Sequence, residues 1–319
     1  MSDRQPSRLG AQRSEPATPV SGVVETIADG LSLVLSYPLV ALLPLAIDLA
    51  LWSGLRISPE SLLRRWSDLS STADSLGFER NVLPLAALGV PSLLKAVSHD
   101  DVYSVWSGTR IEPGSWQLAA TTIVGLALAS TFLGTMFRIP LALVIRAEHR
   151  SLAQIARATT IAWVRLLGLF ALILGTVVLI SSPLLVGGAM FLLAGLDIMP
   201  LIGAALIIPA TAAAIYLMFT PDAIVLTEVG PLRAAYLSFN VVRRNFWPAL
   251  GLLGSVLLIS EGLSVLWRSQ IETPFGLLVG VLGNAFVGAG LALAAMRFYD
   301  DRLRRWRPEM ARPYSSGPT

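Results

Sequence analysis

The sequence predicts an all-helical integral membrane protein, and three observations support this prediction. Of the 319 residues, 54% are apolar and only 14% are charged, with a mean hydropathy of +0.66. Soluble domains have about 45–50% apolar and about 25% charged residues. The apolar residues gather in runs of roughly 20, the length needed to cross about 30 Å of hydrocarbon. The basic residues lie in polar segments between these runs, as expected of a chain oriented by its arginines.

Six apolar runs are predicted to span the membrane. Aromatic side chains near the ends of the runs, for example Tyr37, Trp116 and Trp267, are typical of the membrane interface. The predicted spans are Leu39–Leu55, Leu118–Pro140, Leu166–Val186, Ile198–Phe219, Phe246–Trp267 and Phe275–Arg297.

The distribution of arginine predicts the orientation. Arginines concentrate in both tails and in the junctions after the second and fourth spans, whereas the other side has basic residues mainly in one long loop. We therefore expect both termini in the cytoplasm and one membrane domain over 21–306 with an external insertion at 56–115. The polar segments 1–20 and 307–319 are predicted to be disordered tails. Lys95 is the one lysine, and this arginine bias suggests a GC-rich bacterial genome and hence a prokaryotic plasma membrane.

The segment 83–94 is apolar but shorter than a span, and it contains Pro84 and Pro91. Its length favours a re-entrant or interfacial segment, and a seventh span is the third alternative. Earlier in the same insertion, residues 62–69 are predicted to form a short amphipathic helix on the outer leaflet.

An internal pattern predicts three parallel units, each made of a cytoplasmic interfacial helix followed by a transmembrane hairpin. The ends of the even-numbered spans also resemble one another, at Met136–Pro140, Met218–Pro221 and Met296–Phe298. Chance similarity among helices rich in alanine and leucine is the alternative. The helical stripes are Val24, Ile27, Ala28, Leu31, Val34 and Leu35, then Leu152, Ile155, Ala156, Thr159, Ala162 and Trp163, then Leu232, Ala235, Tyr236, Phe239 and Val242.

Several segments resemble those of a large uncharacterised prokaryotic family of six-span membrane proteins. They are Leu35–Leu39 with Leu43–Leu45, Asp48–Arg56, Glu228–Trp247 and Phe298–Arg304. Relatives of this family include the membrane domain attached to some glycerophosphodiester phosphodiesterases. The resemblance implies six spans and a membrane-embedded, non-catalytic role. The soluble catalytic barrel of the enzyme-linked members has no counterpart here, so no catalytic residue is carried over.

Three polar residues inside the spans form a candidate intramembrane site. Asp48 lies about nine residues into the first span, about 14 Å deep, and Asn284 has a similar depth in the last span. A hydrogen bond between them is expected if these spans are neighbours. Asp48 is a proton or cation site in one interpretation and a helix-packing contact in the other, which we favour. Glu261 lies nearer the outer face, either paired with Arg268 or in a simple polar contact at the interface.

The sequence offers no strong candidate for catalysis. Cysteine is absent, which excludes disulfides and thiolate chemistry. The two histidines are His99, beside two aspartates in the insertion, and His149, in a basic turn. Neither brings the third or fourth ligand that a metal site needs, and no phosphate-binding glycine loop occurs. We therefore predict no metal, no cofactor and no enzymatic activity.

The predicted function is a non-enzymatic membrane component that organises lipid or an envelope partner. Its alternatives are a carrier or channel for a small solute, ion or lipid using Asp48 and Asn284, and, ranked last, an intramembrane hydrolase. The basic charge is attributed to membrane orientation and anionic lipid of the inner leaflet, so no nucleic acid partner is expected; a protein partner and a homo-oligomer are left open. The predicted headgroup contacts are Arg138, Arg146, Arg150, Arg157, Arg243 and Arg244.

Overall fold

A computed structural model describes residues 21–52, 56–57, 83, 89–94, 110–196, 198–270 and 273–307. The predicted tail 1–20, most of the predicted tail 307–319, the helix at 62–69 and His99 lie outside these residues.

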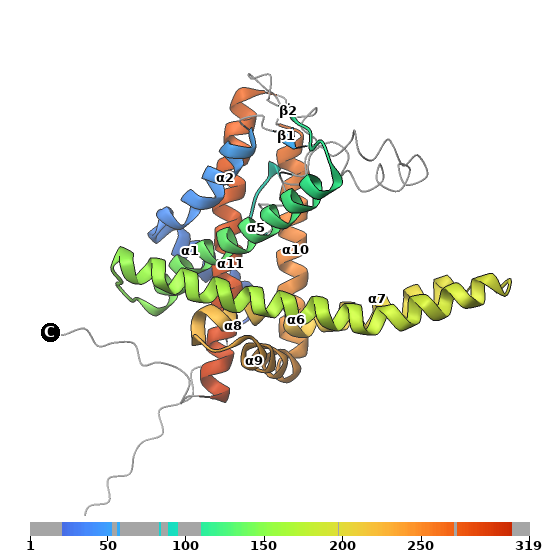
Figure 1. Ribbon diagram of the computed structural model, residues 1–319. Coiled ribbons are helices and arrows are strands. Elements are labelled where there is room, and N and C mark those ends of the chain that lie inside the picture. The colour runs from blue at the N-terminus through green and yellow to red at the C-terminus, as the bar shows by residue number, and fades with distance from the viewer. Residues whose placement is uncertain are drawn as a thin grey trace, which may run out of the picture.

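The described chain is built almost entirely from helices, which confirms the predicted all-α membrane class (Figure 1). One pair of two-residue parallel strands, β1 (Arg56–Ile57) and β2 (Arg110–Ile111), joins the ends of the external insertion. The helices are α1 (Val23–Ser36), the 3-10 helix η1 (Pro38–Ala41), α2 (Leu42–Trp52), α5 (Trp116–Arg146), α6 (Leu152–Leu193), α7 (Met199–Leu217), α8 (Thr220–Thr227), α9 (Pro231–Arg244), α10 (Phe246–Arg268) and α11 (Pro274–Trp306).

Among the described residues, five helical stretches are long and apolar enough to cross a membrane, one of them formed by α7 and α8 together. The bent pair of α1 with η1–α2 makes a sixth if it is counted as one span. The first predicted span, Leu39–Leu55, is described as far as Trp52, where its residues form η1 and α2. A bend separates it from α1. The chain turns by 98° between Ser36 and Pro38. Proline disfavours a helical conformation at the preceding residue and has no N–H to continue a helix, so Pro38 starts a new segment. The 11 residues of α2 alone reach only about 16 Å.

The helices pack in an order that repeats three times. The first part of α6 packs on α5, α9 packs on α7 and α8, and α1 packs on the second half of α11. Each of the three packing helices begins after an extended N-cap residue at the same place in its unit, namely Gly22, Ser151 and Gly230. Each surface helix therefore covers the second span of the unit before it, and α1 closes the circle on the last unit.

Small residues allow these helices to approach closely. A Cβ atom at Gly30 of α1 would lie 2.7 Å from the backbone nitrogen of Ala294 and closer still to the carbonyl of Gly290, so α1 and α11 are in backbone contact. The buried hydroxyl of Ser238, at the same position of α9, accepts a hydrogen bond of 3.2 Å from the N–H of Phe219 and donates one of 2.9 Å to the carbonyl of Tyr216. It thereby pairs two backbone groups at the break between α7 and α8.

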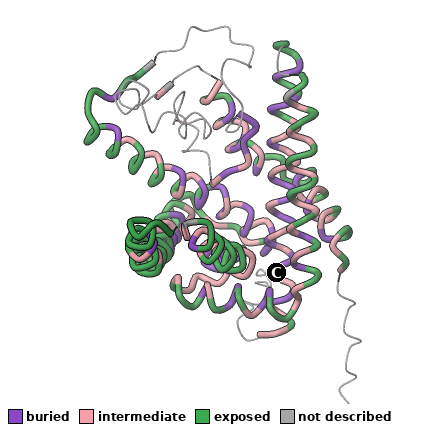
Figure 2. Tube along the Cα trace, turned by 90° about the vertical axis from the view of Figure 1, so that its right-hand side faces the viewer, coloured by how far each residue is buried: buried purple, intermediate pink, exposed green. Residues whose placement is uncertain are grey.

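The core lies where the ends of the even-numbered spans meet. Phe137, Phe219 and Phe298, one from each of the three similar sequence segments, are all buried there. The rings of Phe219 and Phe298 stack with their centroids 5.6 Å apart. Figure 2 shows buried residues concentrated in this bundle.

The predicted apolar stripes point partly away from this core. Their first residues are strongly exposed: Val24 is 80%, Leu152 85% and Leu232 68% exposed. The buried face of α1 carries Thr26, Gly30 and Val34, of which Val34 belongs to the predicted stripe. Exposed apolar side chains on a helix at the edge of a membrane domain are suited to contact with lipid.

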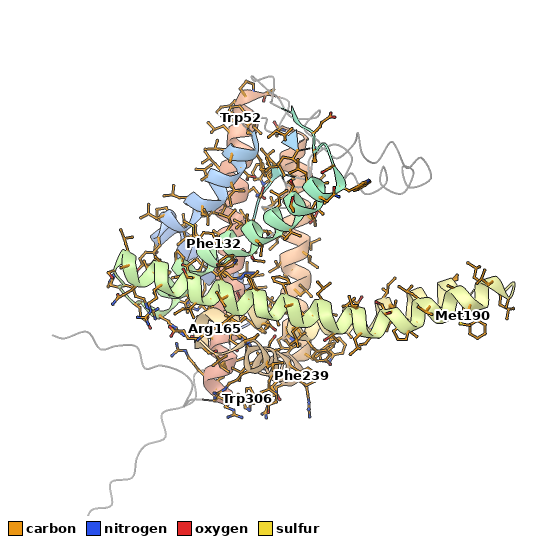
Figure 3. All side chains as sticks on the ribbon, viewed as in Figure 1. Trp52, Phe132, Arg165, Met190, Phe239 and Trp306 are labelled. Atoms are coloured by element: carbon orange, nitrogen blue, oxygen red, sulfur yellow. The ribbon has the colours of Figure 1, made fainter. Side chains whose placement is uncertain are left out.

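The second unit differs from the prediction because its surface helix and its first span form one continuous helix, α6. At 42 residues it is about 63 Å long. Proline follows the bend in the other two units, at Pro38 and Pro248, whereas α6 has only Gly168 at that point, which weakens a helix without ending it. The far part of α6 and α7 form an apolar hairpin that projects beyond the bundle, with Met190 near its far end (Figures 1 and 3).

Candidate functional site

A pocket with a volume of about 780 Å³ lies between the end of α5, the start of α6 and α8. Its floor is apolar and its rim is charged. The apolar residues are Ile139, Ala142, Leu143, Ala158, Ile161, Ala162, Ile224 and Val225, and the polar ones are Arg146, Glu148, His149, Arg150, Gln154, Arg157, Arg165 and Glu228.

Helix caps give the rim a defined backbone. The left-handed conformation of Ala147, with φ of 50°, ends α5, and that of Glu228, with φ of 53°, ends α8. Ser151 and Gln154 form a reciprocal capping box at the start of α6, with hydrogen bonds of 3.4 and 2.9 Å. The charged side chains of the turn between α5 and α6 are thus presented from fixed ends of three helices.

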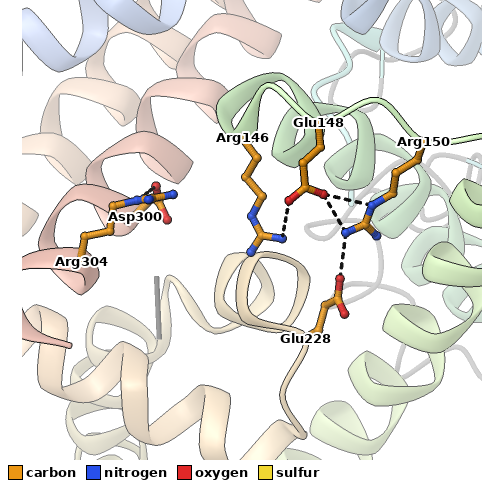
Figure 4. A network of polar contacts seen from close by, with 6 residues as sticks. All are labelled: Arg146, Glu148, Arg150, Glu228, Asp300 and Arg304. Carbon is orange, nitrogen blue, oxygen red and sulfur yellow. Dashed lines mark hydrogen bonds and ion pairs between the residues drawn. The ribbon is translucent and has the colours of Figure 1, made fainter. Parts of the chain in front are cut away.

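A network of ion pairs joins these ends (Figure 4). One guanidinium nitrogen of Arg150 lies 2.9 Å from Glu148 and 3.1 Å from Glu228, and Arg146 lies 3.8 Å from Glu148. Burial lowers the pKa of Arg150, but the hydrogen bonds and charges of Glu228 and Glu148 outweigh this effect, so its pKa lies above the ordinary value. Arg150 therefore stays charged and ties the start of α6 to the end of α8.

Two further arginines of the pocket are available for a ligand. Arg157 and Arg165 lie eight residues apart on α6, and Ala158, Ile161 and Ala162 line the pocket between them. Within the described part of the chain, neither arginine makes an ion pair or a side-chain hydrogen bond. Four arginines against two glutamates leave the pocket with a net charge of +2 when His149 is neutral.

Three of the predicted headgroup contacts, Arg146, Arg150 and Arg157, meet in this one pocket. Arg165 was not among the predicted contacts, although its spacing of eight residues from Arg157 places both on one side of a helix. Glu228 carried no sequence signal, because it lies 78 residues from its partner Arg150.

The other three predicted headgroup contacts lie elsewhere. Nε of Arg138 is 3.4 Å from a carboxylate oxygen of Asp222 in α8, and the Arg138 side chain is 29% exposed. Arg243 and Arg244 are exposed at the end of α9, and the guanidinium of Arg244 lies 4.8 Å from the ring centroid of Trp306. They are outside the pocket.

Asp48 is completely buried, and its partners differ from the predicted one. It accepts hydrogen bonds from the Ser92 hydroxyl at 2.5 Å, the Leu93 N–H at 3.1 Å and the Leu94 N–H at 3.2 Å. The predicted hydrogen bond to Asn284 is not formed among the described residues. Asp48 thus holds the segment 89–94 through these three hydrogen bonds.

The segment 89–94 enters the bundle between helices. The Gly89 N–H donates to the Ser130 hydroxyl at 3.1 Å, halfway along α5. Pro91 rests on Gly288, near the middle of α11, where any Cβ would collide with the proline ring. The described residues 89–94 thus lie against α2, α5 and α11. The three alternatives for 83–94 stay predictions, since its residues 84–88 are outside the described part of the chain.

A small second cavity of about 70 Å³ lies beside this segment, between α10 and α11. Its polar lining is Ser92, Ser260, Glu261, Ser264 and Asn284. The structure therefore places Glu261 and Asn284 at one cavity, whose lining residue Ser92 donates a hydrogen bond to Asp48.

No group of three or more histidine, cysteine or acidic side chains suited to a metal ion occurs among the described residues. His149 lines the large pocket, beside Glu148 and Glu228.

The fold and the pocket together define a multi-pass helical membrane protein with a basic pocket over an apolar floor. No family model, no curated protein and no solved structure matches the chain.

Proposed function

We propose that the protein is a non-enzymatic membrane component that binds the headgroup of an anionic phospholipid in the pocket between α5, α6 and α8. The observation that carries the proposal is the pair Arg157 and Arg165, whose charges have no partner among the described residues at a pocket with an apolar floor. Basic pockets between membrane helices are typical sites for anionic headgroups.

The chemistry of the pocket suits a phosphate bearing acyl chains. Guanidinium groups bind phosphate oxygens through paired, charge-assisted hydrogen bonds. The apolar floor and the exposed side chains of α6 beyond it, such as Val164 and Phe170, offer a continuous surface for the chains. The volume of about 780 Å³ lies within the usual range for small-ligand sites, about 300–1,000 Å³.

The proposal includes a location. The pocket lies on the arginine-rich side of the chain, which we assign to the cytoplasm of a prokaryotic cell together with both termini. Binding there would organise anionic lipid of the inner leaflet around the protein, as expected for the family that the sequence resembles.

Two alternatives rest on single observations. The polar cavity that contains Glu261 and Asn284 favours a carrier or channel, but at about 70 Å³ it has room for only about two waters. The position of His149 beside two glutamates favours a hydrolase. Glu148 and Glu228 are both held by Arg150, however, and the lining includes no serine, threonine or cysteine, so this alternative ranks last.

Lipid binding by purified protein tests the proposal. We expect the double variant Arg157→Gln/Arg165→Gln to bind phosphatidylglycerol at least about tenfold more weakly than wild type, because each arginine near an anionic surface contributes about 1 kcal/mol. The matched control, Arg243→Gln/Arg244→Gln, removes the same charge outside the pocket and should retain binding within about twofold. Native mass spectrometry with phosphatidylcholine as the neutral lipid measures both. Equal losses in the two variants, or no loss in the first, would contradict a pocket for the headgroup.

A further inference from the structure

The two arginines that carry the lipid pocket, Arg157 and Arg165, lie far apart for the binding of a single phosphate group. Eight residues separate them, which is about 12 Å along the axis of α6. Side chains on a helix lean toward its N-terminus, so both guanidinium groups are displaced in the same direction and remain apart. Arginine binds phosphate oxygens at about 2.7–2.9 Å, a distance at which one phosphate group cannot bridge this separation. The pocket therefore offers two separate contacts for anions.

The charge of the pocket matches two phosphodiester groups. Its lining contains four arginines and two glutamates, which gives a net charge of +2 when His149 is neutral. The two glutamates are held in ion pairs by Arg146 and Arg150, at distances of 2.9 to 3.8 Å. The positive charge that this network leaves over is that of Arg157 and Arg165. Because a phosphodiester carries a single negative charge, two such groups balance the pocket and one does not.

The surface of α6 beside these arginines can hold acyl chains. Small and apolar side chains, Ala158, Ile161 and Ala162, form the pocket floor between the two arginines. The apolar face continues along the helix, where Val164 is 59% and Phe170 48% exposed. A lipid can therefore place its chains along α6 while its phosphates face the arginines.

We infer that the ligand of this pocket is a lipid with two phosphodiester groups joined by a short linker, as in cardiolipin, an inference that rests on the proposed lipid-binding function. One phosphate pairs with Arg157 and the other with Arg165, and the linker crosses the small side chains of Ala158 and Ala162. Basic pockets between membrane helices on the cytoplasmic side bind cardiolipin headgroups in other membrane proteins. A phospholipid with one phosphate engages only one of the two arginines at a time.

Native mass spectrometry of the full chain in detergent, with cardiolipin and phosphatidylglycerol as the two probes, tests the inference. Wild type should bind cardiolipin at least about fivefold more tightly, because the second phosphate adds one charge-assisted pair. Arg157→Gln and Arg165→Gln should each reduce this preference to about twofold, the advantage that two phosphates per molecule give at a single arginine. Arg243→Gln removes the same charge outside the pocket and should keep the wild-type preference.

Soluble glycerol bisphosphate distinguishes a lipid from a free bisphosphate as the source of the two phosphates. It lacks acyl chains, so at the same concentration it should leave cardiolipin bound. Displacement of cardiolipin at that concentration would assign the pocket to a soluble ligand and overturn the inference.

Two results would overturn the inference while leaving the proposed function in place. The first is equal binding of cardiolipin and phosphatidylglycerol by wild type. The second is a wild-type preference for cardiolipin in both single variants while both lipids bind more weakly, which would mean that the two arginines bind one phosphate together. Unchanged binding of both lipids by Arg157→Gln/Arg165→Gln would overturn the proposed function as well.

Discussion

Replacing Asp48 by alanine is expected to destabilise the protein more than any other single removal of a carboxylate from α1 or α2. Asp48 is completely buried and receives three hydrogen bonds from the segment 89–94. In the alanine variant the N–H groups of Leu93 and Leu94 lose this acceptor inside the bundle. The Ser92 hydroxyl can rotate toward another group, so we assign no cost to it.

The magnitude follows from these two N–H groups. A buried donor without an acceptor costs about 1–3 kcal/mol, so Asp48→Ala should lower the free energy of unfolding by about 2–6 kcal/mol. Asp48→Asn keeps one carbonyl oxygen and should lose about half as much. The control Asp29→Ala removes a carboxylate that is 43% exposed and lies 3.3 Å from Arg297, so its cost should be at most about 1 kcal/mol.

Unfolding in mixed micelles, followed by circular dichroism as the fraction of SDS is raised, measures all three variants against wild type. The ranking Asp48→Ala, then Asp48→Asn, then Asp29→Ala is expected. If Asp48→Ala unfolds at the same SDS fraction as Asp29→Ala, the carboxylate does not hold the segment 89–94 and the reasoning fails.

Two further predictions concern the repeated packing of the surface helices. Gly30→Leu should lower the Tm strongly because the side chain would collide with the backbone of Gly290, whereas Gly254→Leu, at a site with open space, should change it little; similar effects would disprove the close approach of α1 and α11. Ser238→Ala should cost about 1–3 kcal/mol in the same unfolding assay, because the buried N–H of Phe219 loses its acceptor, and an unchanged stability would show that this bond is dispensable.

Hydropathy predicted most of the spans because a segment of roughly 20 apolar residues has few alternatives to a membrane helix. The 98° bend before the first span depends on Pro38, a local break that hydropathy does not register. Hydropathy also did not predict that the surface helix and the span on either side of Trp163–Leu166 form one continuous helix, because a surface helix can continue into a span wherever no residue ends it. Apolar composition predicts which residues are kept away from water, but it does not predict the residue at which one helix ends and the next begins.

The candidate site was predicted in part for a similar reason. Arg146, Arg150 and Arg157 are close in sequence, so their meeting at one pocket follows from a short turn between two helices. The partners from distant segments, such as Glu228 with Arg150, carried no local pattern. Asp48 was recognised as a buried carboxylate from its depth, but its partners lie 44 to 46 residues away in a segment without regular secondary structure.

The central claim is that the basic pocket faces the cytoplasm and that α6 crosses the membrane from it. The most direct test is to measure on which side of the membrane the pocket and the tip of the α6–α7 hairpin lie. The chain has no cysteine, so single cysteines at His149 and Leu196 can be labelled with a membrane-impermeant maleimide in intact cells and in inverted vesicles. Position 149 lies at the basic pocket and position 196 at the tip of the hairpin. We expect label at 149 only in inverted vesicles and at 196 only in intact cells. Label at 149 in intact cells, or both positions on one side, would contradict a cytoplasmic lipid pocket from which α6 crosses the membrane.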